Sequence, residues 1–141
     1  MKLFLSWNDI TSLVDSLCTQ IRMECEKQDK LVPEVYKGVY GIPRGGVIIA
    51  VLLSHKLNIP YLTSLKEMYG NQFLVVDDIA DTGITLNKLK AEVYLGADIA
   101  TLHYSSDSIV KPKFYVDIKD DDWIVYPWEN ENALEIQDYM L

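Results

Sequence analysis

An acidic stretch in the middle of the chain joins a short apolar run to a helix-like segment. Residues 73–76 read FLVV, and residues 77–85 read DDIADTGIT. A strand that passes through Thr-Gly-Ile-Thr into a helix places backbone N–H groups and two hydroxyls at the positive helix N-terminus, where anions bind. The adjacent carboxylates suit a vicinal diol or a Mg²⁺ ion. A phosphorylated ribose has both parts, so we expect a phosphate-sugar pocket here.

Length and charge limit the possible classes of protein. The 141 residues fit a single domain spanning 1–141, and at this size about two-thirds of the unfolded surface can be buried. The net charge of −8 argues against a nonspecific partner of DNA or RNA, because such binding relies on clustered Lys and Arg. The sequence has neither an export signal nor an apolar run long enough to span a membrane. We therefore expect a cytoplasmic protein.

Strand and helix patterns alternate along the chain. We expect helices at 6–30, 47–57 and 87–95, and strands at 35–42, 59–65, 73–76, 99–104, 114–118 and 123–126. This alternation predicts an α/β fold with an open, mostly parallel sheet flanked by helices. Ligands of such sheets bind where loops converge at the carboxyl ends of the strands. Both glycine-containing loops of this chain follow such ends.

The first of these loops reads Pro43-Arg44-Gly45-Gly46. Its guanidinium group and its glycines, which permit close approach of the backbone to a ligand, suit a pyrophosphate. Taken alone, the same string also fits a plain strand-to-helix turn with an arginine on the surface. Its place one strand and one helix before the acidic stretch favours the anion site.

Three segments resemble those of type I phosphoribosyltransferases, in the order that the family has them. Residues 75–86, VVDDIADTGITL, resemble the signature that binds phosphoribosyl pyrophosphate. Residues 41–46, GIPRGG, resemble the pyrophosphate loop, and residues 123–129, WIVYPWE, resemble the base-binding segment of the xanthine-guanine and hypoxanthine branch. The resemblance implies the type I fold with a small hood over the sheet.

The resemblance also implies a role for each matched position around the sugar. Arg44, Gly45 and Gly46 would hold the diphosphate, with Arg44 neutralising the leaving group. Asp77 and Asp78 would bind the ribose hydroxyls, and Asp78 would hold Mg²⁺. The loop for the 5′-phosphate would consist of Asp81, Thr82, Gly83, Ile84 and Thr85.

Three further roles concern the base. By resemblance, Asp81 would face N7 of a purine as general base or hydrogen-bond acceptor, which makes Asp81 and Arg44 the expected catalytic residues. The ring of Trp123 would stack on the base, and the backbone of Ile124 would read its edge. Aromatic residues near a proline also commonly complete a core, and we expect this of Trp128.

Two features depart from the family pattern. Only residues 66–72 separate the strand at 59–65 from the strand at 73–76, so we expect the flexible loop that closes over the diphosphate to be short or absent. Purine enzymes place a Lys or Arg for the 6-oxo group after the strand at 99–104, where this chain has Ser105-Ser106. Lys111 and Lys113 come later and would reach the base only if their loop folds back.

Three hypotheses about function follow. The leading one is transfer of the 5-phosphoribosyl group from phosphoribosyl pyrophosphate to a purine base (xanthine, guanine or hypoxanthine), with Mg²⁺ as cofactor and release of diphosphate. The second is a non-catalytic regulatory protein that binds phosphoribosyl pyrophosphate or a nucleotide. The third is a phosphoribosyltransferase for a non-purine base, suggested by Ser105. The resemblance also implies a homo-oligomer, either a dimer or a tetramer.

Overall fold

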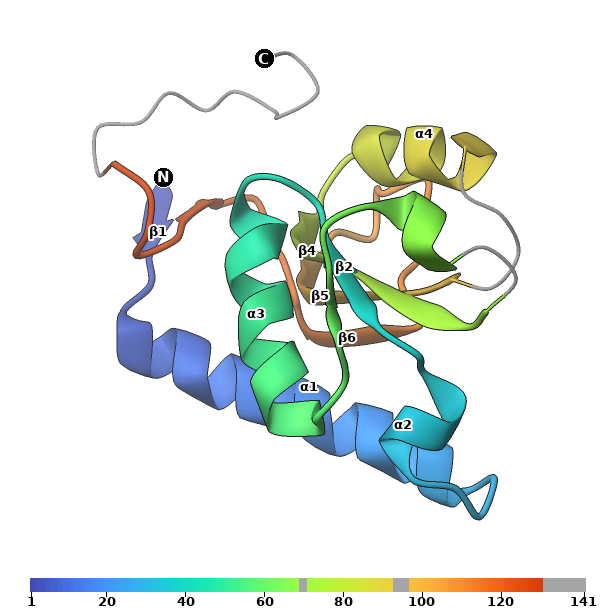
Figure 1. Ribbon diagram of the computed structural model, residues 1–141. Helices are drawn as coiled ribbons and strands as arrows, with labels where there is room; N and C mark the ends of the chain where they lie inside the picture. The colour runs from blue at the N-terminus through green and yellow to red at the C-terminus, as the bar shows by residue number, and fades with distance from the viewer. Residues whose placement is uncertain (69–70, 93–96, 131–141) are drawn as a thin grey trace.

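Five parallel strands form the main sheet of the protein (Figure 1). The computed structural model describes residues 1–68, 71–92 and 97–130. The strand order is β3-β2-β4-β5-β6. Their bounds are β2 Val39–Gly41, β3 Tyr61–Leu62, β4 Phe73–Ala80, β5 Ala97–Tyr104 and β6 Phe114–Ile118. The predicted open, parallel α/β sheet is confirmed.

Helices cover both faces of this sheet. Helices α1 (Trp7–Glu26) and α3 (Gly45–Leu57) lie on one face, and α4 (Ile84–Glu92) lies on the other (Figure 1). Each face has its own apolar cluster: Leu17 and Ile49 belong to the first, and Leu86 belongs to the second. In the part of the chain that the structure describes, no helix is long and apolar enough to cross a membrane.

Local sequence determines where helix α1 begins and which of its faces is buried. The Ser6 hydroxyl accepts a hydrogen bond from the Asp9 N–H at 3.1 Å, and the Asp9 carboxylate accepts one from the Ser6 N–H at 2.8 Å. This reciprocal capping box starts the helix. Its buried residues recur at helical spacing and face the sheet. The helix ends at Glu26 rather than residue 30, and Asp29 beyond it adopts a positive φ of 61°.

The first two predicted strands are shorter than expected. The first of them covers residues 35–42, but Val35 ends a short helix, α2 (Val32–Val35), and β2 begins at Val39. Pro33 lies in the first turn of α2, where its fixed φ favours a helical start. The predicted strand 59–65 likewise reduces to β3, and Leu65 begins a 3₁₀ turn that runs to Met68.

Three elements extend further toward the glycine loops than predicted. Strand β4 runs through Asp77 and Asp78 to Ala80, because its pairing with β5 continues as far as Tyr104. Helix α3 begins at Gly45 rather than residue 47, and α4 begins at Ile84 rather than residue 87. Residues 93–95 of that predicted helix lie outside the described residues. The loops between strands and helices are therefore tighter than the sequence suggests.

A separate two-stranded sheet joins the beginning of the chain to the predicted base-binding segment. Strand β7 (Trp123–Val125) pairs in parallel with β1 (Lys2–Phe4), and Leu3 lies opposite Ile124. The sequence predicts a strand at 123–126, but it predicts neither β1 nor the pairing. This small sheet stands apart from the main sheet, as a hood would.

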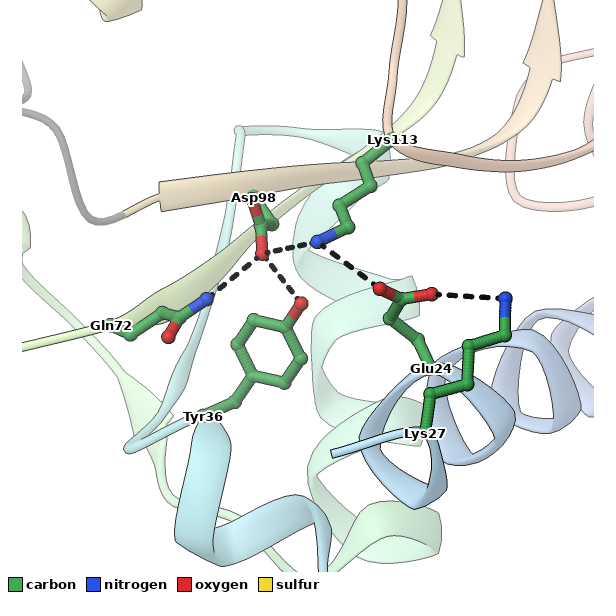
Figure 2. A network of polar contacts seen from close by, with 6 residues as sticks. All are labelled: Glu24, Lys27, Tyr36, Gln72, Asp98 and Lys113. Atoms are coloured by element: carbon green, nitrogen blue, oxygen red, sulfur yellow. Dashed lines mark hydrogen bonds and ion pairs between the residues drawn. The ribbon is translucent and has the colours of Figure 1, made fainter. Parts of the chain in front are cut away.

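A network of polar contacts lies at the amino-terminal ends of the strands of the main sheet (Figure 2). Oδ2 of Asp98, in β5, accepts hydrogen bonds from the Tyr36 hydroxyl at 2.6 Å and from Gln72 Nε2 at 3.1 Å, and it lies 3.4 Å from Lys113 Nζ. Lys113 also pairs with Glu24 of α1 at 3.8 Å. Burial and the hydrogen bond to Asp98 raise the pKa of Tyr36, which stays a neutral donor. The network ties α1 to the beginnings of β5 and β6.

Candidate functional site

The carboxyl end of β4 carries the two adjacent acids. Asp77 is buried, and its Oδ1 accepts the Asp78 N–H at 2.9 Å. Oδ1 of the half-buried Asp78 accepts the Ile79 N–H at the same distance. Hydrogen bonds to ionised carboxylates are among the stronger ones in proteins. These contacts hold both carboxylates in fixed orientations at the strand end.

The turn after β4 forms a small polar cavity of about 40 Å³, lined by Asp77, Asp78, Ile79, Ala80, Asp81, Thr82, Gly83, Thr85 and Leu86. Gly83 has a φ of 82°, and a Cβ there would lie 2.5 Å from Ser108 Oγ and 2.8 Å from the Val110 nitrogen. Only glycine fits this position. Because α4 begins at the next residue, the cavity lies at a positive helix end.

The Arg44 loop lies against the acidic strand end. Arg44 is the exposed N-cap of α3, and its peptide bond with Pro43 is cis. A Cβ on Gly45 would overlap Oδ2 of Asp78, and a Cβ on Gly46 would overlap the Val76 carbonyl oxygen. Glycines therefore allow the first turn of α3 to touch β4. The two loops singled out in the sequence meet at the contact between Gly45 and Asp78.

A larger cavity of about 320 Å³ opens beside this contact. Its lining residues are Arg44, Gly45, Ile48, Asp78, Trp128, Glu129 and Asn130. Asp78 lines both cavities, so it borders the turn at 81–85 and also the cavity that Arg44 lines. A ligand with one anionic group at each end and hydroxyls between them matches this order of groups.

Lys119 joins the acidic turn to Trp123. Lys119 Nζ lies 3.0 Å from both carboxylate oxygens of Asp81 and 5.4 Å from the centre of the Trp123 ring. The side chains of Lys119 and Asp81 are only 12% and 16% exposed, so the ion pair is largely shielded from solvent. A donor and an acceptor beside a half-buried indole suit a flat heterocycle with a carbonyl next to a ring nitrogen.

Lys119 was not predicted from the sequence. The cation of purine enzymes follows the strand that corresponds to 99–104, and the lysines next along the chain are Lys111 and Lys113. Lys113, however, pairs with Asp98 and Glu24 at the opposite end of the sheet. Lys119 instead follows the next strand, β6. The signal was present, since Lys119 is the single basic residue in the run DIKDDD at 117–122.

The backbone of Ile124 faces away from β1. In the parallel pair, the Trp123 N–H donates to the Met1 carbonyl at 2.9 Å, and the Leu5 N–H donates to the Val125 carbonyl at 3.0 Å. Because alternate residues of a strand direct their backbone groups to opposite edges, those of Ile124 point to the other edge. This orientation is the one that reading the edge of a ligand requires.

Trp128 has a second role beside the expected one. Its ring stacks on Tyr126 with centroids 4.9 Å apart and an angle of 4° between the planes, and it lies 5.9 Å from the Trp7 ring. As predicted, it packs against the core. It also lines the larger cavity, which was not predicted from the sequence. Next to it, Glu129 Oε1 accepts the Tyr126 N–H at 2.8 Å.

An open parallel sheet with an acidic strand end, a glycine turn at a helix N-terminus and an arginine-glycine loop is the arrangement of the type I phosphoribosyltransferase class. Relatives specify the class further. Xanthine-guanine phosphoribosyltransferases from Vibrio parahaemolyticus and Vibrio atlanticus are 32% and 30% identical to this chain, over 82% of its length and 85% of theirs. The chain belongs to the xanthine-guanine phosphoribosyltransferase family. No protein-family model matches it.

Solved structures agree with this assignment. A purine phosphoribosyltransferase from Pyrococcus horikoshii superimposes with a TM-score of 0.76 at 28% identity, covering 96% of this chain and 99% of that one. The xanthine-guanine-hypoxanthine phosphoribosyltransferase of Helicobacter pylori superimposes with a TM-score of 0.70 over 92% of this chain and 94% of its own. At 17% identity, this second likeness supports the fold alone.

Proposed function

We propose that this protein transfers the 5-phosphoribosyl group from phosphoribosyl pyrophosphate to xanthine, guanine or hypoxanthine and releases diphosphate. One observation carries the proposal: Asp78 lies between two cavities, one built by the turn at 81–85 and the other reached by Arg44. A phosphoribosyl pyrophosphate molecule has a monoester, a diol and a diphosphate in the same order.

The sugar phosphate occupies the smaller cavity in this proposal. The backbone of residues 81–85 and the hydroxyls of Thr82 and Thr85 bind the monoester at the N-terminus of α4. The carboxylates of Asp77 and Asp78 accept hydrogen bonds from the ribose hydroxyls. The fixed orientation of the two carboxylates supports this assignment.

The diphosphate occupies the larger cavity, held by Arg44 and by the backbone of Gly45 and Gly46. Mg²⁺ fits here, since it binds through one or two carboxylates and substrate phosphates, and Asp78 faces the cavity that Arg44 lines. When bound, the ion would neutralise charge on the leaving diphosphate. Arg44 helps to neutralise the same charge, because its guanidinium group is permanently positive.

The base binds beside Trp123, whose ring stacks on it. Lys119 donates to the 6-oxo group, Asp81 accepts from the N7 side as hydrogen-bond acceptor or general base, and the Ile124 backbone reads the base edge. The ion pair between Lys119 and Asp81 supports this arrangement, because a 6-oxopurine presents an acceptor and a ring N–H to the same two side chains. The non-purine alternative loses its basis, since a cation is present after β6.

The reaction requires positioning more than covalent chemistry. The bond between C1 of the ribose and the diphosphate breaks, positive charge develops at C1, and the purine nitrogen forms the new bond. The protein holds the three partners in line, balances the charge on the diphosphate and limits access of water. Only residues 63–72 lie between β3 and β4, so little chain is available on that side to cover the reacting centre.

A panel of bases tests the proposal. The protein is incubated with Mg²⁺, phosphoribosyl pyrophosphate and each of xanthine, guanine, hypoxanthine, adenine, uracil and orotate, and diphosphate release is measured. We expect release of diphosphate with at least one 6-oxopurine and no release with adenine, uracil or orotate. Calorimetric binding of phosphoribosyl pyrophosphate without turnover of any base would favour the regulatory alternative, for which the short segment at 63–72 is the supporting feature.

The assembly and location belong to the same proposal. We take residues 1–141 as one phosphoribosyltransferase domain that forms a dimer or tetramer in the cytoplasm. Partly exposed apolar residues on α3, among them Val51, support self-association, because a helix that is apolar all round normally packs on more than one side. Light scattering at micromolar concentration measures the oligomer directly.

A further inference from the structure

Tyr126 connects three parts of the site. It directly follows β7 and is only 3% exposed. Its hydroxyl oxygen lies 2.8 Å from His103 Nδ1 and 3.3 Å from the backbone carbonyl oxygen of Asp78. Its ring stacks on Trp128, and its backbone N–H donates to Glu129. The buried Tyr126 thus contacts the strand of the acid pair through its hydroxyl, and two residues that line the larger cavity through its ring and its backbone.

The proton positions in this contact follow from donor and acceptor capacity. A carbonyl oxygen only accepts, so the single phenolic proton of Tyr126 is directed to Asp78. With the phenolic proton on the Asp78 carbonyl, the hydroxyl oxygen is left to accept from His103, which requires the imidazole proton to be on Nδ1. His103 is 5% exposed. Burial lowers its pKa by more than the nearby charge of Asp117 raises it, so the ring is neutral. The chain of donors therefore runs from His103 through Tyr126 to Asp78.

The same series of hydrogen bonds reaches the side chain of Asp78. The carbonyl that Tyr126 contacts belongs to the peptide unit between Asp78 and Ile79, and the N–H of that unit donates to Asp78 Oδ1 at 2.9 Å. Turning this peptide plane moves the N–H that fixes the carboxylate. Hydrogen bonds linked in this way also polarise one another.

We propose that Tyr126 is a positioning residue that sets the Asp78 carboxylate against the sugar of the substrate through this peptide unit. The inference rests on the proposed function of the site and adds to it a residue that touches neither substrate. The base contacts at Lys119, Asp81 and Trp123 do not pass through Tyr126, so its hydroxyl acts on the phosphoribosyl pyrophosphate side of the reaction.

The kinetic test is Tyr126→Phe, which keeps the ring stacked on Trp128 and removes the hydroxyl. We expect KM for phosphoribosyl pyrophosphate to rise about fivefold to tenfold, the equivalent of one hydrogen bond. Because the sugar is held alike in ground and transition states, kcat and the KM for the purine stay within about twofold. Tyr61→Phe, which removes the hydroxyl of an exposed tyrosine on β3, is the matched control and changes none of the three constants.

A spectroscopic test does not depend on turnover. The ¹⁵N shifts of the His103 ring are expected to show a neutral imidazole protonated at Nδ1 in the wild-type protein, and a changed tautomer balance in Tyr126→Phe. His103→Asn, whose amide can donate from the place of Nδ1, should keep KM for phosphoribosyl pyrophosphate closer to wild type than His103→Leu does. This pair of variants decides the question if Tyr126→Phe does not fold.

Three outcomes would overturn the inference: a neutral wild-type His103 protonated at Nε2, a folded Tyr126→Phe with unchanged KM for phosphoribosyl pyrophosphate, or an equal rise in KM for both substrates. If the wild-type protein turns over no base, the proposed function fails separately. The tautomer then still tests the donor chain, and the dissociation constant of ribose 5-phosphate replaces KM, with the same rise expected in Tyr126→Phe.

Discussion

The two ends of the main sheet each pair a buried tyrosine with an aspartate, but they do so differently. At the amino-terminal edge, the Tyr36 hydroxyl donates to the Asp98 carboxylate itself, which also binds Gln72 and Lys113 (Figure 2). At the carboxyl-terminal edge, the Tyr126 hydroxyl approaches the backbone carbonyl of Asp78, and the carboxylate of that residue lines two cavities.

This difference separates an acid that holds elements together from one that we propose binds the ligand. Three donors of the protein meet on one oxygen of Asp98, so the carboxylate serves to hold elements together. Asp78 is oriented by backbone groups, and its side chain borders space that a ligand can enter. Residue type does not distinguish the two, whereas the partners of the carboxylate do.

The largest expected effect is at Asp81. Asp81→Asn keeps the size of the side chain but removes its charge and basicity, so we expect kcat to fall about 100-fold, with KM for phosphoribosyl pyrophosphate within about threefold. Steady-state kinetics with a saturating 6-oxopurine measures both constants. Asp98→Asn, at the other end of the sheet, is the matched control and should leave kcat unchanged. Equal and small effects from both substitutions would contradict the assigned role of Asp81.

A smaller effect is expected where the two loops meet. Gly45→Ala places a methyl group on the Asp78 carboxylate, so the side chain has to move from between the two cavities. We expect kcat/KM for phosphoribosyl pyrophosphate to fall about 30-fold, a loss of about 2 kcal/mol in transition-state binding. Circular dichroism shows whether the fold is kept. A folded variant with wild-type kcat/KM would show that this contact does not position Asp78.

The amino-terminal edge should respond in stability instead. Asp98→Asn removes the charge from an acceptor shared by three donors, and we expect the free energy of unfolding to fall by about 1.5 kcal/mol. Urea denaturation measures this loss, and the activity of the remaining folded protein should equal that of the wild type. A reduced kcat without loss of stability would contradict the role of Asp98 in holding the fold together.

The smallest effect concerns pH. Burial lowers the pKa of His103 in the folded protein below 6.5, its ordinary value, so the unfolded state binds more protons as the pH falls past 6.5. Stability is therefore full above that pH and declines below it until the folded-state pKa is reached. Denaturation midpoints between pH 5 and 7.5 should show this decline in the wild type and a weaker one in His103→Asn. Identical profiles would contradict a buried, neutral His103.

The sequence predicted the sheet, and it singled out most of the residues of the candidate site, because both depend on local patterns. The apolar run before Asp77 and the glycine in the turn at 81–85 are readable from neighbours in the chain. Lys119 was missed because its partner Asp81 is distant in sequence and the pair forms only when β6 lies beside β5. The pairing of β1 with β7 joins the two ends of the described chain, and no local pattern reveals it.

Binding of ribose 5-phosphate tests the central claim most directly, since this molecule carries the monoester and the diol without the diphosphate. A crystal structure of the protein with ribose 5-phosphate should show the phosphate on the backbone amides and hydroxyls at residues 82–85 and the ribose hydroxyls on Asp77 and Asp78. A sugar phosphate bound elsewhere, with this turn empty at saturating concentration, would contradict the account.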